Sequence, residues 1–333
     1  MDTLIEQCQV APPPDGAVEF TLPFTYFDHF WLAFHRMRRI LFYKLPIAKL
    51  DFVQNIIPSL KDSLSLILKH YTPLAGNVSC PLDSSGYPEL RYVMDDSVSV
   101  TFLETDMDFN YLAGDHPRNA KDFYHFVPQL GEPKDTLGFK SAPVLAIQNL
   151  ILSRRLSLTH VTFFIVTCAY VWTCLIKSEA AIGEDIDDNF NPPLPPSYFG
   201  NCIVGYIARI RHADLAGKEG FTIAVELIRE SIQKRMNDEE WILNGSWFRQ
   251  YTNVDLNRCL SVAGSQKLDL YAADFSWGRP SKLEFVSIDS DNGISMSLGK
   301  SKDFDGDLEV GLSLSKTRMN AFAAIFTHGL SFL

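Results

Sequence analysis

The sequence predicts a mixed α/β fold in which helices cover β-sheets. Two observations support this prediction. Residues 52–71 and 219–236 each carry an apolar stripe at helical spacing, which is typical of long amphipathic helices. Short apolar or alternating stretches, typical of strands, lie between and after these helices.

The first half of the chain contains three predicted strands and one long helix. Pro58 either kinks the helix predicted at 52–71 or marks a restart at its first turn. Strands are predicted at 90–93, 97–104 and 144–152. The last of these is expected to be buried, because it is apolar almost throughout.

The second half alternates helices and strands. Helices are predicted at 158–177, 219–236 and 316–328. Strands are predicted at 203–210, 268–274, 283–288, 294–298 and 308–314. The side chains expected to face inward from the last two helices are Phe221, Val225, Ile228 and Ile232, and Met319, Phe322, Ala323 and Phe326.

Composition excludes several classes of protein. The 333 residues carry a formal net charge of −10, which argues against nucleic-acid binding. The N-terminus lacks the basic start and apolar core of a signal peptide, and the longest apolar run, 161–176, is too short for a membrane span. Six cysteines without a Cys-x-x-Cys pair are typical of reduced thiols. We therefore expect a cytoplasmic protein.

The most distinctive stretch is Asp274-Phe275-Ser276-Trp277-Gly278-Arg279-Pro280. Gly278 permits backbone angles closed to other residues, and Pro280 cannot donate to a sheet ladder. The pattern predicts a tight loop, stiffened by aromatic rings, between two strands. Two interpretations stay open from these residues alone: a structural clamp, or the lip of a ligand tunnel.

Common catalytic motifs are absent from the sequence. It contains no Gly-x-Ser-x-Gly elbow, no phosphate-binding loop with correct spacing and no His-Glu-x-x-His, so we expect neither serine-hydrolase chemistry nor a metal site. Any of the eight histidines could act as a general base near neutral pH. His160, at the start of the apolar helix predicted at 158–177, is the best placed of them.

Several stretches, in order along the chain, resemble the plant acyl-CoA-dependent acyltransferases of the BAHD family. The loop at 274–280 resembles that family's Asp-Phe-Gly-Trp-Gly signature, with Ser276 in place of a glycine. Tyr198-Phe199-Gly200-Asn201 resembles a second recurrent motif. Further matches lie at 25–28, 70–77, 167–174 and 309–312. The resemblance covers nearly the whole chain and is strongest to the branch that malonylates phenolic and anthocyanin glucosides.

This resemblance implies a two-lobed fold like that of chloramphenicol acetyltransferase, with lobes at 1–152 and 153–333. CoA and the acceptor alcohol enter a tunnel from opposite sides, and a histidine in a His-x-x-x-Asp motif removes the proton of the acceptor hydroxyl. The signature loop is mainly structural and lies on the CoA side. The residues that the resemblance assigns to this loop are Asp274, Phe275, Trp277, Gly278 and Arg279, and those of the second motif are Tyr198, Phe199, Gly200 and Asn201.

The chain departs from the family pattern at the catalytic motif. The residues four places after the eight histidines are Ala33, Arg39, Leu74, Ala120, Gln129, Phe164, Ala216 and Phe332. None is aspartate, so no residue is assigned as the family's catalytic base. The motif in relatives lies between a strand like 144–152 and a helix like 158–177, which nearly join here. A block the size of a small domain is therefore expected to be missing, which leaves the first lobe incomplete.

A second departure lies in the acidic run 185–189, where relatives tend to have arginines, one of which can pair with the signature aspartate. Asp274 is therefore expected to lack its counter-charge. We also expect the missing block to expose apolar surface around 147–152, with aggregation as the symptom.

The function expected from the resemblance is transfer of an acyl group, malonyl above all, from CoA to a hydroxyl of a phenolic or flavonoid glucoside. Acyl-CoA would be a co-substrate and no cofactor would be permanently bound. The alternative is a truncated member without catalysis, either a ligand-binding relic or the product of a mis-spliced gene. In both cases we expect a monomer that binds neither nucleic acid nor membranes.

Overall fold

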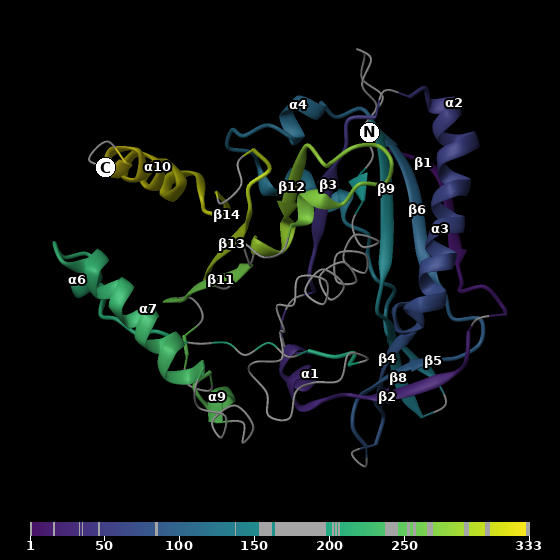
Figure 1. The fold of residues 1–333 in the computed structure, drawn as a ribbon, viewed down its shortest axis with the longest axis horizontal. Coiled ribbons are helices and arrows are strands. Elements are labelled where there is room, and N and C mark those ends of the chain that lie inside the picture. The colour runs from purple at the N-terminus through teal and green to yellow at the C-terminus, as the bar shows by residue number, and fades with distance from the viewer. Residues whose placement is uncertain are drawn as a thin grey trace, which may run out of the picture. The chain divides into compact units, whose positions relative to one another are not determined.

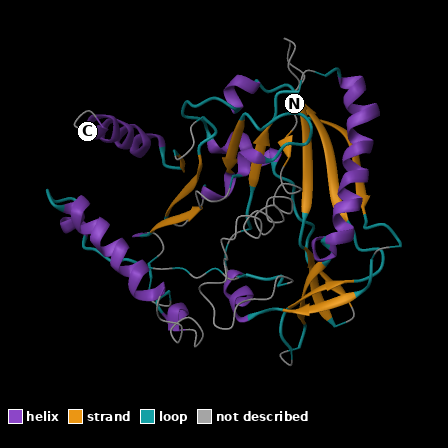
Figure 2. Ribbon diagram, viewed as in Figure 1, coloured by secondary structure: helices purple, strands orange, loops and turns teal. Residues whose placement is uncertain are grey.

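The structure is a computed structural model that describes residues 2–152, 162–163 and 198–330, apart from gaps at 16, 33, 35, 46, 84–85, 137, 202, 204, 206, 237–245, 252–253, 256–257, 265–268, 290–292 and 304–306. The chain divides into two compact units. Unit 1 comprises Met1–Pro23, His35–Ile176 and Asn257–Leu333, and unit 2 comprises Phe24–Phe34 and Lys177–Leu256. Every described strand belongs to unit 1, whereas the regular elements described in unit 2 are helices (Figure 2). A lobe boundary at residue 152 remains a prediction.

The elements of the first half run from β1 to β9 (Figure 1). Their bounds are β1 Thr3–Val10, β2 Phe20–Pro23, α1 Tyr26–Trp31, β3 Arg39–Phe42, α2 Lys49–Asp51, α3 Ile57–His70, β4 Asn77–Pro81, β5 Glu89–Tyr92, β6 Val98–Thr105, α4 Phe109–Leu112, β7 Lys134–Thr136, β8 Phe139–Pro143 and β9 Ala146–Leu152. The described elements that follow are β10 Thr162–Phe163, α6 His212–Leu215, α7 Gly220–Met236, α9 Ser246–Arg249, β11 Leu260–Gly264, β12 Lys282–Phe285, β13 Ile294–Lys300, β14 Leu308–Leu312 and α10 Lys316–Leu330.

Four sheets organise unit 1. Their strand orders are β1-β6-β9, β10-β3-β12, β11-β13-β14 and β2-β5-β4-β8-β7. Pairing in the first sheet is antiparallel between β1 and β6 and parallel between β6 and β9. In the second sheet, β3 lies between β10 and β12 and pairs antiparallel with both.

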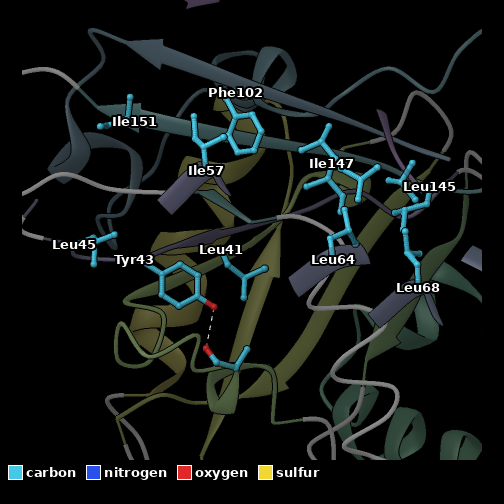
Figure 3. Packing of buried hydrophobic residues seen from close by; sticks show 14 of the residues in the cluster. Leu41, Tyr43, Leu45, Ile57, Leu64, Leu68, Phe102, Leu145, Ile147 and Ile151 are labelled. Atoms are coloured by element: carbon cyan, nitrogen blue, oxygen red, sulfur yellow. Dashed lines mark hydrogen bonds between the residues drawn. The ribbon is translucent and has the colours of Figure 1, made fainter. Parts of the chain in front are cut away.

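The main core lies between α3 and the β1-β6-β9 sheet. Leu64 and Leu68 of α3 are buried, as predicted, and they share a cluster with Phe102 of β6 and Ile147 of β9 (Figure 3). Pro58 occupies the first turn of α3, directly after a π-helical turn at Phe52–Ile56. Ile56 and Ile57 both have right-handed helical backbone angles, so the chain stays helical through Pro58 and the restart interpretation is not borne out.

The strands predicted near 90, 100, 144, 294 and 308 are confirmed within a few residues, and so are the helices α7 and α10. The helix predicted at 158–177 is wrong at its two described residues, Thr162 and Phe163, which pair with β3. Its remaining residues lie outside the described part of the chain.

Two other predicted strands are wrong, and in both of them described backbone groups bond to partners other than a neighbouring strand. Leu270–Ala272 forms a 3₁₀ turn, in which Ala272 N donates to Asp269 O at 3.1 Å. The described residues of 203–210 form no strand. There, side chains take the place of a ladder: Trp31 Nε1 donates to Ile203 O at 3.2 Å, and Gln250 Nε2 donates to Gly205 O at 2.8 Å. The strand predicted at 283–288 is shorter than expected and ends at Phe285, where a 3₁₀ turn, Val286–Ile288, begins.

The predicted burial of two helices is also wrong. In α7, the side chains of Phe221, Val225 and Ile228 are exposed, and in α10 those of Phe322 and Phe326 are exposed. The side chain of Ile232 lies outside the described part. Exposure was instead predicted around 147–152, yet every residue of β9 is buried. This strand is covered because α3 packs on one face and Phe123 and Phe126 lie in the cluster on the other.

Candidate functional site

The loop at 274–280 is held from within by its first residue. The Oδ1 atom of Asp274 accepts hydrogen bonds from the backbone amides of Trp277, at 3.1 Å, and Gly278, at 3.0 Å. Gly278 has a φ of +82°, as its predicted role requires, and Ser276 has a φ of +67°. A serine in this left-handed region is strained by about 1–2 kcal/mol, which gives a physical reason for the glycine at this position of the family signature.

The aromatic side chains of this loop pack against Tyr43, which directly follows β3. Tyr43 is fully buried, and its ring lies 5.8 Å from that of Phe275 and 5.9 Å from that of Trp277, edge-on to both. Its hydroxyl donates to Ala273 O at 2.9 Å (Figure 3). Burial, and then the nearby charge of Asp274, raise the pKa of the Tyr43 hydroxyl, so this group stays a donor at neutral pH. These contacts favour the structural-clamp interpretation of the loop.

The carboxylate of Asp274 is exposed, and no cation of the described residues forms an ion pair with it. Arg279, in the same loop, is also exposed. The backbone amides of Trp277 and Gly278 therefore provide partners for the Asp274 carboxylate, which was expected to lack its counter-charge. The acidic run 185–189 lies outside the described residues.

The two stems of the loop are joined by a ring of hydrogen bonds that we call the Glu309 clamp, made of Tyr271, Lys282, Leu283 and Glu309. Tyr271 is buried, and its hydroxyl accepts from Leu283 N at 3.1 Å and donates to Glu309 Oε2 at 2.5 Å. Lys282 Nζ donates to Glu309 Oε1 at 2.5 Å. The clamp thus connects the loop to the stretch 309–312, which sequence analysis treated as a separate motif.

Lys282 belongs to a wider network of charges beside this clamp. Its ammonium also donates to Asp115 Oδ1 at 2.8 Å. Burial alone lowers the pKa of Lys282, but the bonds to Asp115 and Glu309 outweigh burial and raise that pKa overall. The bond to Lys282 lowers the pKa of Asp115. Two residues further along β12, Glu284 Oε1 lies 2.6 Å from Arg118 Nη1. Burial raises the pKa of the Glu284 carboxyl despite this nearby cation.

The second motif, Tyr198 to Asn201, lies against Asp28 of α1 in unit 2. Asp28 Oδ1 accepts from Asn201 N at 2.9 Å and from Asn201 Nδ2 at 2.7 Å. Its Oδ2 accepts from Thr25 N at 2.8 Å and from Thr25 Oγ1 at 2.6 Å, so both carboxylate oxygens are used. These bonds also cap the start of α1.

Gly200 lies close to two side chains that a larger residue would crowd. A Cβ at this position would lie 2.8 Å from the Tyr198 hydroxyl and 3.3 Å from Asp28 Oδ2. The Tyr198 hydroxyl in turn donates to Asn201 O at 3.1 Å, and Phe199 is half-buried. The structure therefore brings together two stretches, 25–28 and 198–201, that sequence analysis recognised separately.

His160 lies outside the described residues. Within the described part of the chain, no group of three or more His, Cys, Asp or Glu side chains is arranged to hold a metal ion. No helix described there is both long and apolar enough to cross a bilayer.

Comparison with known proteins decides the family. The model of the Transferase family matches residues 151–328. Phenolic glucoside malonyltransferase 1 of Nicotiana tabacum is 57% identical, over 100% of both chains. A malonyl-coenzyme:anthocyanin 5-O-glucoside-6'''-O-malonyltransferase of Salvia splendens is 32% identical, over 97% of this chain and 94% of its own length. The chain belongs to the BAHD acyltransferases.

The fold class predicted from sequence is confirmed for this BAHD member. Vinorine synthase has the same fold, with a TM-score of 0.67 over 96% of each chain and 16% identity. The family and its relatives are acyltransferases, so the predicted enzyme class is confirmed as well.

The alignment with the Nicotiana relative bears on the expected missing block. It runs over 453 positions, whereas this chain has 333 residues. At least 120 aligned positions, the difference between 453 and 333, therefore have no residue in this chain. Because the alignment covers both chains completely, these positions are internal.

Sequence reasoning missed the Glu309 clamp and the bond between Asp28 and Asn201. Both pairs join residues far apart in the chain, and no periodicity or spacing signals such contacts. The resemblance did mark Asp28, Asn201 and Glu309 as motif residues, which was the one available signal.

Proposed function

We propose that this chain transfers a malonyl group from malonyl-CoA to a hydroxyl of a phenolic glucoside. The observation that carries the proposal is the 57% identity to a phenolic glucoside malonyltransferase over the whole length of both proteins. The relative from Salvia splendens supports the same donor and a glycosylated phenolic acceptor. The chain is proposed to act as a cytoplasmic monomer on these small molecules.

In the proposed reaction, the malonyl group passes from the sulfur atom of CoA to the oxygen atom of the glucoside hydroxyl. The oxygen of the glucoside hydroxyl attacks the thioester carbonyl carbon of malonyl-CoA, and the bond between that carbon and sulfur breaks. The products are a malonate ester of the glucoside and CoA thiol, which receives the proton lost by the hydroxyl. A general base that accepts this proton accelerates such a step by about 10²–10⁴-fold.

The base is the part that this sequence lacks in its usual form. None of the eight histidines is followed by aspartate at the fourth residue, so no His-x-x-x-Asp motif is present. We therefore expect turnover about 10²–10⁴-fold slower than that of a relative with the motif. We propose that His160 acts as a general base in place of the motif histidine and restores part of the lost rate.

One observation favours a second candidate function, binding without catalysis. The 120 or more aligned positions without a residue here are as many as a small domain contains. A chain that lacks such a block could keep ligand-binding surfaces while losing turnover. A mis-spliced transcript would have the same consequence, and long-read sequencing tests it: recovery of a longer message with the His-x-x-x-Asp motif would identify this chain as a splicing product.

The test is an assay of the purified full chain with malonyl-CoA and a phenolic glucoside. Mass spectrometry of the glucoside detects the added malonyl group, and a thiol reagent measures released CoA. The proposal predicts slow product formation that falls further in the His160→Ala variant, while His328→Ala, a change at an exposed position of α10, leaves it unchanged. Absence of product after prolonged incubation, with malonyl-CoA binding retained in calorimetry, would establish the second candidate instead.

A further inference from the structure

The loop at 274–280, which we call the Asp274 loop, is flanked by two segments, its stems. These two stems are anchored differently. The stem after the loop enters β12, where Ser281 N donates to Phe42 O at 2.7 Å and the ladder with β3 continues from there. The stem before it is the 3₁₀ turn Leu270–Ala272, which is part of no sheet. This first stem therefore depends on side-chain contacts for its position.

Glu309 on β14 supplies the contact that reaches both stems. One carboxylate oxygen accepts from the Tyr271 hydroxyl on the first stem, and the other accepts from the Lys282 ammonium on the second. Leu283 N, next to Lys282, donates to the Tyr271 hydroxyl and closes the ring. An ionised carboxylate is the one side-chain group that offers two acceptor oxygens without a competing donor.

Two polar side chains of the Glu309 clamp are buried and depend on Glu309 for hydrogen bonds. Tyr271 is 2% exposed and Lys282 is 9% exposed, so neither polar group can turn to bulk water when Glu309 is removed. Asp115 would still pair with Lys282, but Asp115 lies on neither stem. Asp274 cannot substitute for Glu309, because its described bonds are confined to its own loop.

We propose that Glu309 is a positioning residue, whose carboxylate fixes the Asp274 loop on Tyr43 by holding both stems at once. The effect on the loop is independent of turnover, whereas its consequence for acyl transfer rests on the proposed function. Loss of Glu309 is expected to loosen residues 272–283 while the rest of unit 1 stays closed.

Hydrogen–deuterium exchange measured by mass spectrometry tests this in the full chain. In Glu309→Ala, amides of the peptide 272–283 should exchange about 10-fold faster, because an unmade buried hydrogen bond lowers the cost of local opening. In Glu309→Gln, which keeps one acceptor oxygen, the increase should be smaller. Peptides of α3 and β6 should exchange as in the wild type in both variants.

Glu104→Ala is the matched control. Glu104 is also a partly covered strand glutamate that pairs with a lysine, Lys49, but it lies on β6, which pairs with β1 and β9. It should leave exchange of 272–283 unchanged. Tyr271→Phe, which removes both the donor to Glu309 and the acceptor for Leu283 N, should reproduce the loop effect, and adding Glu309→Gln to it should have less than an additive effect.

Two results would overturn the proposal. One is wild-type exchange of 272–283 in Glu309→Ala. The other is an equal rise in all peptides in both Glu309→Gln and Tyr271→Phe, because general destabilisation would then account for the loop.

Discussion

Two helices with similar sequence patterns, α3 and α7, have opposite environments. The apolar stripe of α3 is buried against the β1-β6-β9 sheet, and Leu68 is 0% exposed. The apolar stripe of α7 is open, and Phe221 is 82% exposed. Periodicity thus identifies which face of a helix is apolar, but burial of that face requires a partner surface elsewhere in the chain.

The last helix behaves like α7. Ile325 of α10 is 73% exposed, and the rings of Phe322 and Phe326 stack on each other at 5.6 Å. On β11 and β14, Val262 and Val310 are exposed too. Apolar side chains are thus exposed on the later elements α7, α10, β11 and β14, whereas β9, where exposure was predicted, is buried. Exposed apolar faces of this kind promote association.

The largest predicted effect compares matched isoleucines on the two helices. Ile57→Ala in α3 should lower the free energy of unfolding by about 2–5 kcal/mol, since Ile57 is 1% exposed and its removal leaves a cavity. Ile228→Ala in α7 should change it by less than about 0.5 kcal/mol, since Ile228 is exposed. Urea denaturation measures both, and equal losses would break the comparison between the helices.

The second prediction concerns Asp274, whose exposed carboxylate is held by two backbone amides of its own loop. Asp274→Ala should lower the free energy of unfolding by about 1 kcal/mol, because two backbone amides lose their acceptor. Asp274→Asn should be nearly neutral, since its side-chain oxygen can accept both bonds. Thermal unfolding of the two variants decides. A loss in Asp274→Asn as large as in Asp274→Ala would show that the charge matters, as an ion pair requires.

A smaller gain is predicted at Ser276. Ser276→Gly should raise the free energy of unfolding by about 0.5–1 kcal/mol, because glycine adopts the φ of +67° without strain but loses more entropy on folding. Ser281→Gly is the comparison variant and should lower the free energy of unfolding, because the Ser281 hydroxyl donates to Phe42 O and glycine removes that bond. A lower melting temperature in Ser276→Gly would contradict the strain argument.

The smallest effect concerns acid. The pKa of Asp115 is lowered by its bond to Lys282, so its contribution to stability is present above the ordinary carboxylate pKa and is lost as the pH falls through the lowered value. Asp115→Asn should therefore be slightly less stable than the wild type at neutral pH, and equally stable only once the pH has fallen below the lowered pKa. Denaturant titrations across this range provide the measurement, and a gap that widens on acidification would reverse the assigned sign.

Periodicity predicted six of the fourteen described strands, because period-two patterns are local properties: β5, β6, β9, β12, β13 and β14. The family and its two-lobed fold came from the resemblance of the motifs. The buried face that periodicity predicted for α7 is wrong, because burial depends on surfaces outside that helix. Sequence analysis also identified Asp28, Asn201, Tyr271 and Glu309 only as members of separate stretches. Their hydrogen bonds depend on how the chain folds back on itself, and an isolated sequence pattern contains no such distance.

The rate of malonyl transfer tests most directly whether this chain keeps the acyltransferase scaffold without the family's general base. Initial rates with malonyl-CoA and one phenolic glucoside should be compared with those of the Nicotiana tabacum relative under identical conditions. A rate about 10²–10⁴-fold lower, with the same malonylated product, is the predicted result. A rate equal to that of the relative would contradict it, because the missing His-x-x-x-Asp motif would then carry no catalytic cost.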